Sequence, residues 1–185
     1  MADVLTASQR HLNMSRIHSS GTIPEEILRH ALWRRGFRYR MNDKKLPGKP
    51  DLVLPKYHTI IFIHGCFWHG HKGCKYYTIP KTNTDFWTSK VARNQEHDQR
   101  VWRDLEATGW SVIIVWECEL KKACLKNTID RVEAEIKAAG EKYHQLLNAR
   151  KEERARVRKE REARHEQQSA VEAKIGKRIK AHSGN

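Results

Sequence analysis

Histidines and cysteines are concentrated in one short stretch of this chain, between His64 and Cys74. Within it, Cys66, His71 and Cys74 are separated by four and two residues, a spacing that suits three corners of a tetrahedral zinc site. Cys118 follows a strand-like segment and is the candidate for the fourth corner, where two parts of the chain would meet. The alternative is a loop rich in Cys and His that binds no metal.

The same stretch contains side chains that a zinc site does not need. His69 is not required as a ligand, and an imidazole held rigid beside a metal-bound loop can transfer protons near neutral pH. Phe67 and Trp68 are large apolar rings next to glycines, which is an unusual place for core residues. We expect these two rings to contact a binding partner.

A carboxylate and an imidazole are expected to meet at one edge of a sheet. Asp51 follows Pro50 at the start of one predicted strand, and His64 ends the next. Adjacent antiparallel strands would bring both to the same edge. A carboxylate there can bind Mg²⁺ and hold it against a phosphate. Taken alone, the Pro-Asp pair also fits an ordinary turn.

The predicted helix over residues 84–107 carries a row of functional groups. Trp87, Lys90, Asn94 and Asp98 share one helical face. Together they make a poor core stripe and a good contact surface. The alternative is a partly exposed amphipathic helix, with Trp87 tucked under a loop. Asp98 is also a candidate to orient His69 and to stabilise its protonated form.

The elements that must position these residues follow from apolar periodicity. Residues 59–64 are apolar on both faces, which predicts a central strand in a sheet covered by helices. Gly109 is predicted to end the helix over residues 84–107, and Gly140 to close the globular part after a short helix around residues 129–136. The other predicted elements are a helix over residues 23–35 with a Thr22–Glu25 capping box, and strands over residues 37–40, 51–54 and 110–116.

Composition divides the chain into three parts. Residues 1–20 are polar with isolated apolar side chains and are predicted to form a flexible arm. Residues 21–140 form the globular domain. From residue 141 to 185, thirteen Lys or Arg stand against seven Asp or Glu, which indicates a charged single helix or a disordered tail. The net positive charge of this tail would add nonspecific affinity for DNA.

Charge and cysteine content limit the class of protein. The chain has 185 residues, a net charge of +14 and a pI near 9.8, so we expect a polyanionic partner, and nucleic acid fits best. A membrane surface is the weaker alternative, because the sequence has neither a long apolar run nor a signal peptide. We therefore expect a cytosolic protein, where cysteines bind metals rather than form disulfides, and Cys124 is left as a plain thiol.

These motifs closely resemble the very short patch repair (Vsr) DNA mismatch endonucleases. The resemblance covers about residues 8 to 121, and its most specific string is His64-Gly65-Cys66-Phe67-Trp68-His69. It implies an α/β, restriction-endonuclease-like three-layer fold with a central mixed sheet and a structural Zn²⁺ site. It also implies Mg²⁺-dependent nicking 5′ to the T of a T·G mismatch, which leaves a 5′-phosphate and a 3′-hydroxyl.

The resemblance further implies roles for individual residues. The catalytic set would be Asp51, His64, His69, Asp98 and Glu25, and Mg²⁺ would be held by Asp51 and the backbone carbonyl of Ile63. Zinc would be held by Cys66, His71, Cys74 and Cys118. The DNA contacts would be Phe67, Trp68 and Trp87 as a major-groove wedge, Met14 from the minor groove, and Lys90 and Asn94 as readers of the wobble pair.

The implied partners are double-stranded DNA with a T·G mismatch and, through function, a cytosine-5 DNA methyltransferase, because such mismatches arise by deamination of 5-methylcytosine. Mismatch-repair proteins are further candidate partners, and a monomer in the bacterial cytoplasm, at the nucleoid, is expected. One alternative is a zinc-stabilised protein that binds distorted DNA without cutting it. The other is a related nuclease of ordinary site specificity. Intact Asp51, His64, His69 and Asp98 favour the enzyme over the non-cleaving binder.

Overall fold

The computed structural model describes residues 8–9, 12 and 21–182, with side chains described as far as residue 169. The predicted contact residue Met14, and most of the predicted arm, lie outside the described residues. The chain divides into two compact units, residues 1–141 and 142–185. Each unit is treated by itself below.

A four-stranded mixed sheet organises the first unit. Its order is β1-β2-β3-β4, in which β1 pairs with β2 and β2 with β3 in antiparallel fashion, whereas β3 and β4 are parallel. The prediction of a mixed α/β architecture is confirmed. The strands are β1 (Arg40–Met41), β2 (Leu52–Leu54), β3 (Thr59–His64) and β4 (Ser111–Trp116).

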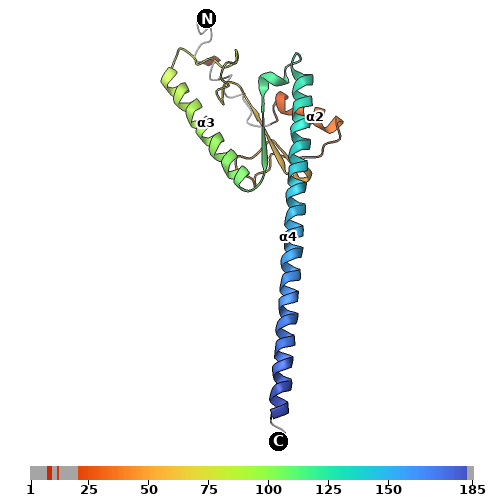
Figure 1. The fold of residues 1–185 in the computed structure, drawn as a ribbon. Coiled ribbons are helices and arrows are strands. Elements are labelled where there is room, and N and C mark those ends of the chain that lie inside the picture. The colour runs from red at the N-terminus through yellow and green to blue at the C-terminus, as the bar shows by residue number, and fades with distance from the viewer. Residues whose placement is uncertain (1–7, 10–11, 13–20, 183–185) are drawn as a thin grey trace. The chain divides into compact units, whose positions relative to one another are not determined.

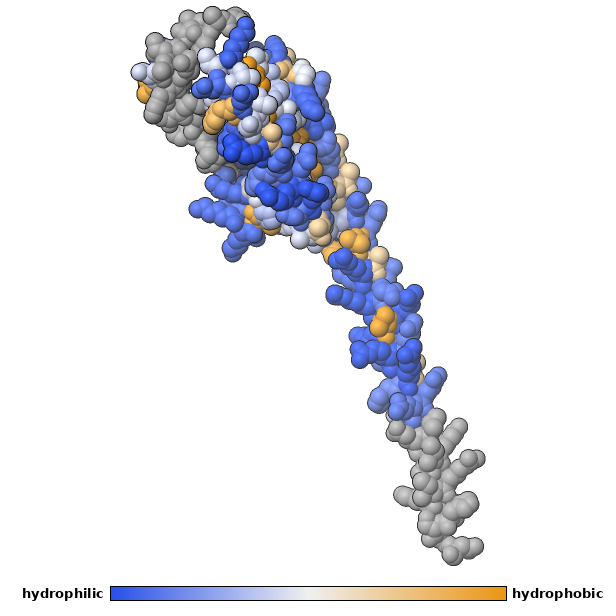
Figure 2. Space-filling view, turned by 90° about the vertical axis from the view of Figure 1, so that its left-hand side faces the viewer, coloured by the Kyte–Doolittle hydropathy of each residue, from blue (hydrophilic) through white to orange (hydrophobic). Residues whose placement is uncertain are grey.

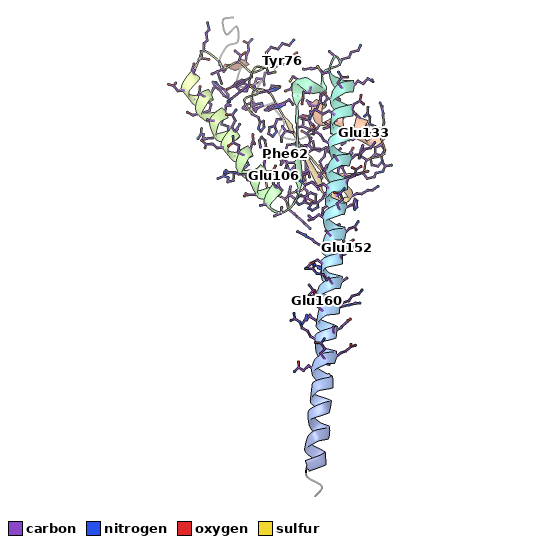
Figure 3. All side chains as sticks on the ribbon, viewed as in Figure 1. Phe62, Tyr76, Glu106, Glu133, Glu152 and Glu160 are labelled. Atoms are coloured by element: carbon purple, nitrogen blue, oxygen red, sulfur yellow. The ribbon has the colours of Figure 1, made fainter. Side chains whose placement is uncertain are left out.

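Helices cover both faces of this sheet, as the apolar strand β3 requires. Helix α3 (Thr84–Ala107) lies on one face, and α2 (Ile23–Arg34) with the first part of α4 (Leu125–His182) on the other (Figure 1). Alternate strand residues point to opposite cores. Phe62 packs with Val101 and Leu105 between α3 and the sheet (Figure 3). The opposite core contains Leu28 and Leu32 of α2, Leu52, Leu54, Ile61, Ile113 and Val115 of the strands, and Ile129, Val132 and Ile136 of α4.

Helix α3 begins and ends at the predicted residues, and one side chain on its buried side is unusual. Val91, Val101 and Leu105 are buried, as an amphipathic helix requires. Asp98 is buried beside them, with a residue exposure of 9 %. Because a carboxylate is costly to bury without a partner, this position indicates a specific role.

One strand prediction is wrong, and a predicted short helix is longer than expected. The strand predicted over residues 37–40 is reduced to β1, because Phe37 packs into the core against the ring of Tyr57, 5.3 Å away. The short helix predicted around residues 129–136 is the first part of α4, which continues past Gly140 to His182, as the helical alternative for the charged tail expects. A Cβ at Gly140 would lie 2.6 Å from Tyr57, so this glycine provides room for a ring. Glycine costs about 1 kcal/mol relative to alanine inside a helix, and at this position it allows the ring of Tyr57 to pack against α4.

The second unit is the remainder of α4 and is polar. Its side chains between residues 148 and 169 are exposed, and Arg156 and Arg158 form ion pairs with glutamates three or four residues away. Figure 2 shows this helix as almost entirely hydrophilic, with a few apolar side chains between the polar ones. A search of the described residues finds no helix long and apolar enough to span a membrane.

Candidate active site and metal centre

The strand register brings two distant parts of the chain together. In the parallel pair β3 and β4, His64 lies opposite Trp116. The segments that follow both strands therefore leave the sheet at the same edge. One is the Cys/His-rich loop that begins at Gly65, and the other is the short helix η2 (Glu117–Leu120), which carries Cys118.

The four predicted zinc ligands form one cluster. The thiol sulfurs of Cys66, Cys74 and Cys118 and a ring nitrogen of His71 all lie within 4.8 Å of one another. His71 Nδ1 is 3.5 Å from Cys66 Sγ and 3.4 Å from Cys118 Sγ. A tetrahedral zinc ion with ordinary bond lengths separates its sulfur and nitrogen ligands by about 3.6 Å. The donor set and its spacing fit a four-coordinate metal, and Cys124 lies exposed outside the cluster.

The acidity of two of these thiols points the same way, whereas the hydrogen bond from Tyr76 N–H lowers the pKa of Cys74. Burial, reinforced by hydrogen bonds with the other two thiols, raises the pKa of Cys118 to about 12. Burial also raises the pKa of Cys66. Three thiols packed this closely repel one another as thiolates, and a bound dication removes that repulsion. The cluster is therefore suited to hold a metal ion.

His69 and Asp98 form the central contact of the candidate active site. Nδ1–H of His69 donates to Oδ2 of Asp98 at 2.6 Å, since an ionised carboxylate can only accept. The contact joins the loop after β3 to helix α3, and Asp98 is the more buried partner, with side-chain exposures of 12 % against 26 %. The structure thus brings together the two residues that were predicted to act as a base and its orienting group.

His64 packs directly on this pair. Its ring stacks on His69 with centroids 3.8 Å apart, and its Nδ1 lies 3.9 Å from Asp98 Oδ2. That nitrogen is buried and makes no hydrogen bond within the described part of the chain. Burial, together with the charge of His69, lowers the pKa of His64 to about 4, although Asp98 opposes the shift. His64 is therefore a neutral imidazole at physiological pH.

Two tryptophans that were not predicted as site residues enclose His64. Trp102 lies 5.7 Å and Trp116 5.4 Å from its ring. Trp116 also stacks on His71, with centroids 4.1 Å apart and ring planes at 6°. Ring contacts thus connect the Cys/His cluster to the imidazoles of His64 and His69. The sequence signal for Trp116 was its position at the end of a strand, but its neighbours depend on the strand register.

Asp51 was predicted at the start of a strand and lies in the bend directly before β2. Its Oδ2 accepts a hydrogen bond from Ile63 N–H at 2.7 Å. Burial raises the pKa of Asp51 to about 6, Glu25 adds to the shift, and His69 and Lys49 oppose it. A buried carboxylate with a raised pKa is a group that a divalent cation stabilises. The contact with Ile63 is through its N–H, and a contribution of its carbonyl stays a prediction.

Glu25 lies close enough to Asp51 to affect its pKa but has its own partners. Its carboxylate accepts hydrogen bonds from Gly21 N–H, Thr22 N–H and the Thr22 hydroxyl at 3.0, 3.3 and 2.9 Å. These contacts form the predicted capping box at the start of α2. Glu25 therefore caps the N-terminus of α2 and, through its charge, also raises the pKa of Asp51.

The three predicted wedge residues form one ring cluster. Phe67 lies 5.2 Å from Trp68 and 5.3 Å from Trp87, and the two tryptophans are 6.0 Å apart. Phe86, which was not predicted as a contact, joins the cluster 5.1 Å from Trp87 and is 55 % exposed. Lys90 is exposed one turn further along α3. The three predicted rings are half-buried and Phe86 is exposed, so together with the nearby cation they form a surface suited to stacking and to anions.

Helix α3 also fixes the backbone of the loop. Asn94 Nδ2 donates to the carbonyl of Trp68 at 2.8 Å, and Gln95 Nε2 donates to the carbonyls of His69 and Gly70, each at 3.2 Å. Gly70 has φ of +63°, and a Cβ there would lie 2.4 Å from Gln95 Nε2. Gln95 was missed because it lies one residue away from the predicted face.

The chain is similar to one protein family and to several known proteins. Residues 2–75 match the family model described as DNA mismatch endonuclease Vsr. The chain is 51 % identical over 140 residues to the type II nicking enzyme V.NmeAIP of Neisseria meningitidis, which covers 75 % of this chain and 99 % of that protein. It is 43 % identical over 121 residues to the DNA mismatch endonuclease Vsr of Escherichia coli, covering 65 % and 77 % of the two chains. The type II nicking enzyme V.XorIIP of Xanthomonas oryzae is 42 % identical over 135 residues, covering 70 % and 98 %.

Proposed function

Because this chain belongs to the Vsr family of DNA mismatch endonucleases, we propose that it nicks duplex DNA at T·G mismatches. The cut falls 5′ to the mismatched T and leaves a 5′-phosphate and a 3′-hydroxyl. The observation that supports this most directly is the hydrogen bond of 2.6 Å between His69 and Asp98. His69 is also close enough to the buried carboxylate of Asp51 to lower the pKa of that group. Membership of the family also implies a restriction-endonuclease-like fold, and we propose that this chain has it.

His69 is the proposed general base. Since its Nδ1–H donates to Asp98, its Nε2 keeps a lone pair that can accept a proton from the attacking water. Asp98 fixes the orientation of the ring and stabilises the imidazolium that forms. His64 stacks on the face of the His69 ring, and its low pKa keeps it from adding a second positive charge there.

Asp51 is the proposed ligand of a catalytic Mg²⁺, in agreement with its burial and raised pKa. The metal would offset the charge that grows on the scissile phosphate and on the departing 3′ oxygen. Ile63 N–H holds one carboxylate oxygen of Asp51 in place. Glu25, with its charge near Asp51, adds to the negative potential that attracts a cation.

The Cys/His cluster is the proposed site of a structural Zn²⁺. Four protein ligands leave no open position for substrate, so the metal would stabilise the loop rather than take part in the reaction. Phe67, Trp68 and His69 lie between the ligands Cys66 and His71. Fixing those two ligands therefore fixes both the wedge and the base.

The ring cluster supports the proposed preference for a mismatch. Insertion of Phe67, Trp68 and Trp87 between base steps would cost unstacking of a few kcal/mol per step, and a poorly stacked T·G pair lowers that cost. Deamination of 5-methylcytosine produces such pairs. We therefore propose a functional association with a cytosine-5 DNA methyltransferase.

The His69→Ala variant tests the proposed chemistry, with His97→Ala as its matched control. His97 is an exposed histidine of α3 whose recorded partner is Arg100. Under single-turnover conditions with Mg²⁺, His69→Ala should nick T·G duplexes about 10²-fold or more slowly at unchanged DNA affinity, whereas His97→Ala should match the wild type. A wild-type rate for His69→Ala would remove this residue from the mechanism and leave His64 as the next candidate.

A further inference from the structure

The second unit of the chain has arginines on one side of its helix. Arg150, Arg154, Arg158 and Arg161 follow at intervals of four, four and three residues. At 100° per residue these four side chains span about 80° of the helix circumference and about 16 Å of its length. We call this set the arginine stripe. No Asp or Glu falls within its sector, since the acidic residues of this segment are Glu152, Glu153, Glu160, Glu162 and Glu166.

The charges on the rest of the helix are organised differently. Arg156, on another side, lies between Glu153 and Glu160 and pairs with both, at 2.9 and 3.8 Å. Within the arginine stripe, Arg158 lies at the edge of the sector and forms an ion pair with Glu162. Arg150, Arg154 and Arg161 have no ion pair or hydrogen bond with any described residue. Their side chains are all exposed.

This segregation is unfavourable for an isolated helix. Like charges four residues apart, as in Arg150 with Arg154 and Arg154 with Arg158, destabilise a helix by a few tenths of a kcal/mol per pair. A bound polyanion reverses that effect. The residue type is informative as well, because the guanidinium fork matches the oxygens of a phosphate better than a lysine ammonium does.

We propose that the arginine stripe binds the phosphate backbone of duplex DNA, independently of sequence and away from the mismatch. The choice of duplex DNA as the polyanion rests on the proposed function, and the stripe itself does not. Residues 141–185 hold thirteen Lys or Arg against seven Asp or Glu. Each phosphate contact releases counterions, so the stripe adds both affinity and salt dependence. Its effect is to keep the enzyme on DNA between encounters with mismatches.

A triple variant of the full-length protein, Arg150→Gln with Arg154→Gln and Arg161→Gln, tests the stripe. Glutamine preserves helix propensity. The matched control is Lys142→Gln with Arg156→Gln and Lys159→Gln, which removes the same number of charges outside the stripe sector. Affinity for a fully matched labelled duplex is measured by fluorescence anisotropy between 50 and 200 mM salt. The slope of log K against log salt is then compared, because each phosphate contact is expected to contribute about 0.9 to its magnitude.

The stripe variant should lose about 2 to 3 from that slope, and the control less than about 1. Equal losses in both variants would assign the effect to bulk charge and overturn the proposal. No loss in either would overturn it too and favour an acidic protein as the partner. Replacement of the same three arginines by lysine, with helicity checked by circular dichroism, should retain most of the slope. A lysine variant as weak as the glutamine variant would contradict an electrostatic role.

These readouts are independent of the proposed nicking activity. Both charge variants should nick T·G duplexes at the wild-type rate at low salt, because no stripe residue belongs to the catalytic site. Failure of the wild type to nick T·G would refute the proposed function and leave the binding slopes interpretable. Loss of nicking in the stripe variant alone, with its slope unchanged, would contradict the separation of the two roles.

Discussion

The carboxyl group of Asp51 is buried in the folded chain, so its contribution to the free energy of unfolding depends on pH. Its pKa is raised to about 6 in the folded chain, chiefly by burial. The unfolded carboxyl titrates near its ordinary value of about 3.9, so between about pH 4 and 6 the folded state binds more protons than the unfolded state. The free energy of unfolding therefore falls as pH rises through this window and stays lower above it.

The substitution Asp51→Asn should remove that loss. In Mg²⁺-free buffer at pH 8 the variant should be more stable than the wild type by about 3 kcal/mol, and the gap should close near pH 4. Denaturant unfolding at the two pH values measures both differences, with the exposed Asp104→Asn as the control. The same change should abolish metal-dependent nicking while retaining DNA binding. A variant less stable than the wild type at pH 8 would contradict the assigned burial cost.

At the scale of elements, the loop after β3 is held from two directions. The Cys/His cluster joins it to η2 after β4, and Asn94 and Gln95 join it to α3. His69 lies in the segment held by both sets of contacts, and its own carbonyl accepts one of the hydrogen bonds from Gln95. The position of the proposed base therefore depends on the Cys/His cluster, whose residues need not touch DNA.

The variant Cys118→Ser should disrupt that attachment. We expect insoluble or unfolded protein without zinc, whereas Cys124→Ser, which changes an exposed thiol outside the cluster, should behave as the wild type. Elemental analysis should give one zinc per wild-type chain. Soluble and fully active Cys118→Ser protein that lacks zinc would refute the structural role of the cluster.

Sequence patterns predicted those elements whose signals are local. The apolar run of β3 and the periodicity of α3 suffice to place both, and the string from His64 to Cys74 carries most of the candidate site within a few residues. The close packing of Gly140 against Tyr57 was not predictable, because the ring comes from a distant segment of the chain. The roles of Trp116 and Gln95 depend on strand register and on one residue of helix rotation. Neither quantity is visible in a single sequence.

At the scale of the whole molecule, the candidate site and the basic helix belong to different units. The buried side chains of both described cores lie at or before Ile136, and the first unit ends at Glu141. Residues 1–141 should therefore fold without the remainder of α4. This truncated protein should nick T·G duplexes at low salt at the full-length rate, yet bind matched duplexes more weakly near physiological salt. A truncated chain that is folded by circular dichroism but inactive at low salt would show that the tail takes part in catalysis.

Mismatch-specific nicking by this protein is tested most directly by one cleavage assay. End-labelled duplexes that differ only in carrying T·G, U·G or C·G at one position are incubated with the wild-type protein in Mg²⁺, with Asp51→Asn as the inactive control. We expect a single nick 5′ to the T in the T·G duplex, with a 3′-hydroxyl at the break, and no cleavage of the C·G duplex or by Asp51→Asn. Equal cleavage of the T·G and C·G duplexes would indicate ordinary site specificity, and tight binding without any cleavage would indicate a non-cutting binder; either result would contradict mismatch-specific nicking.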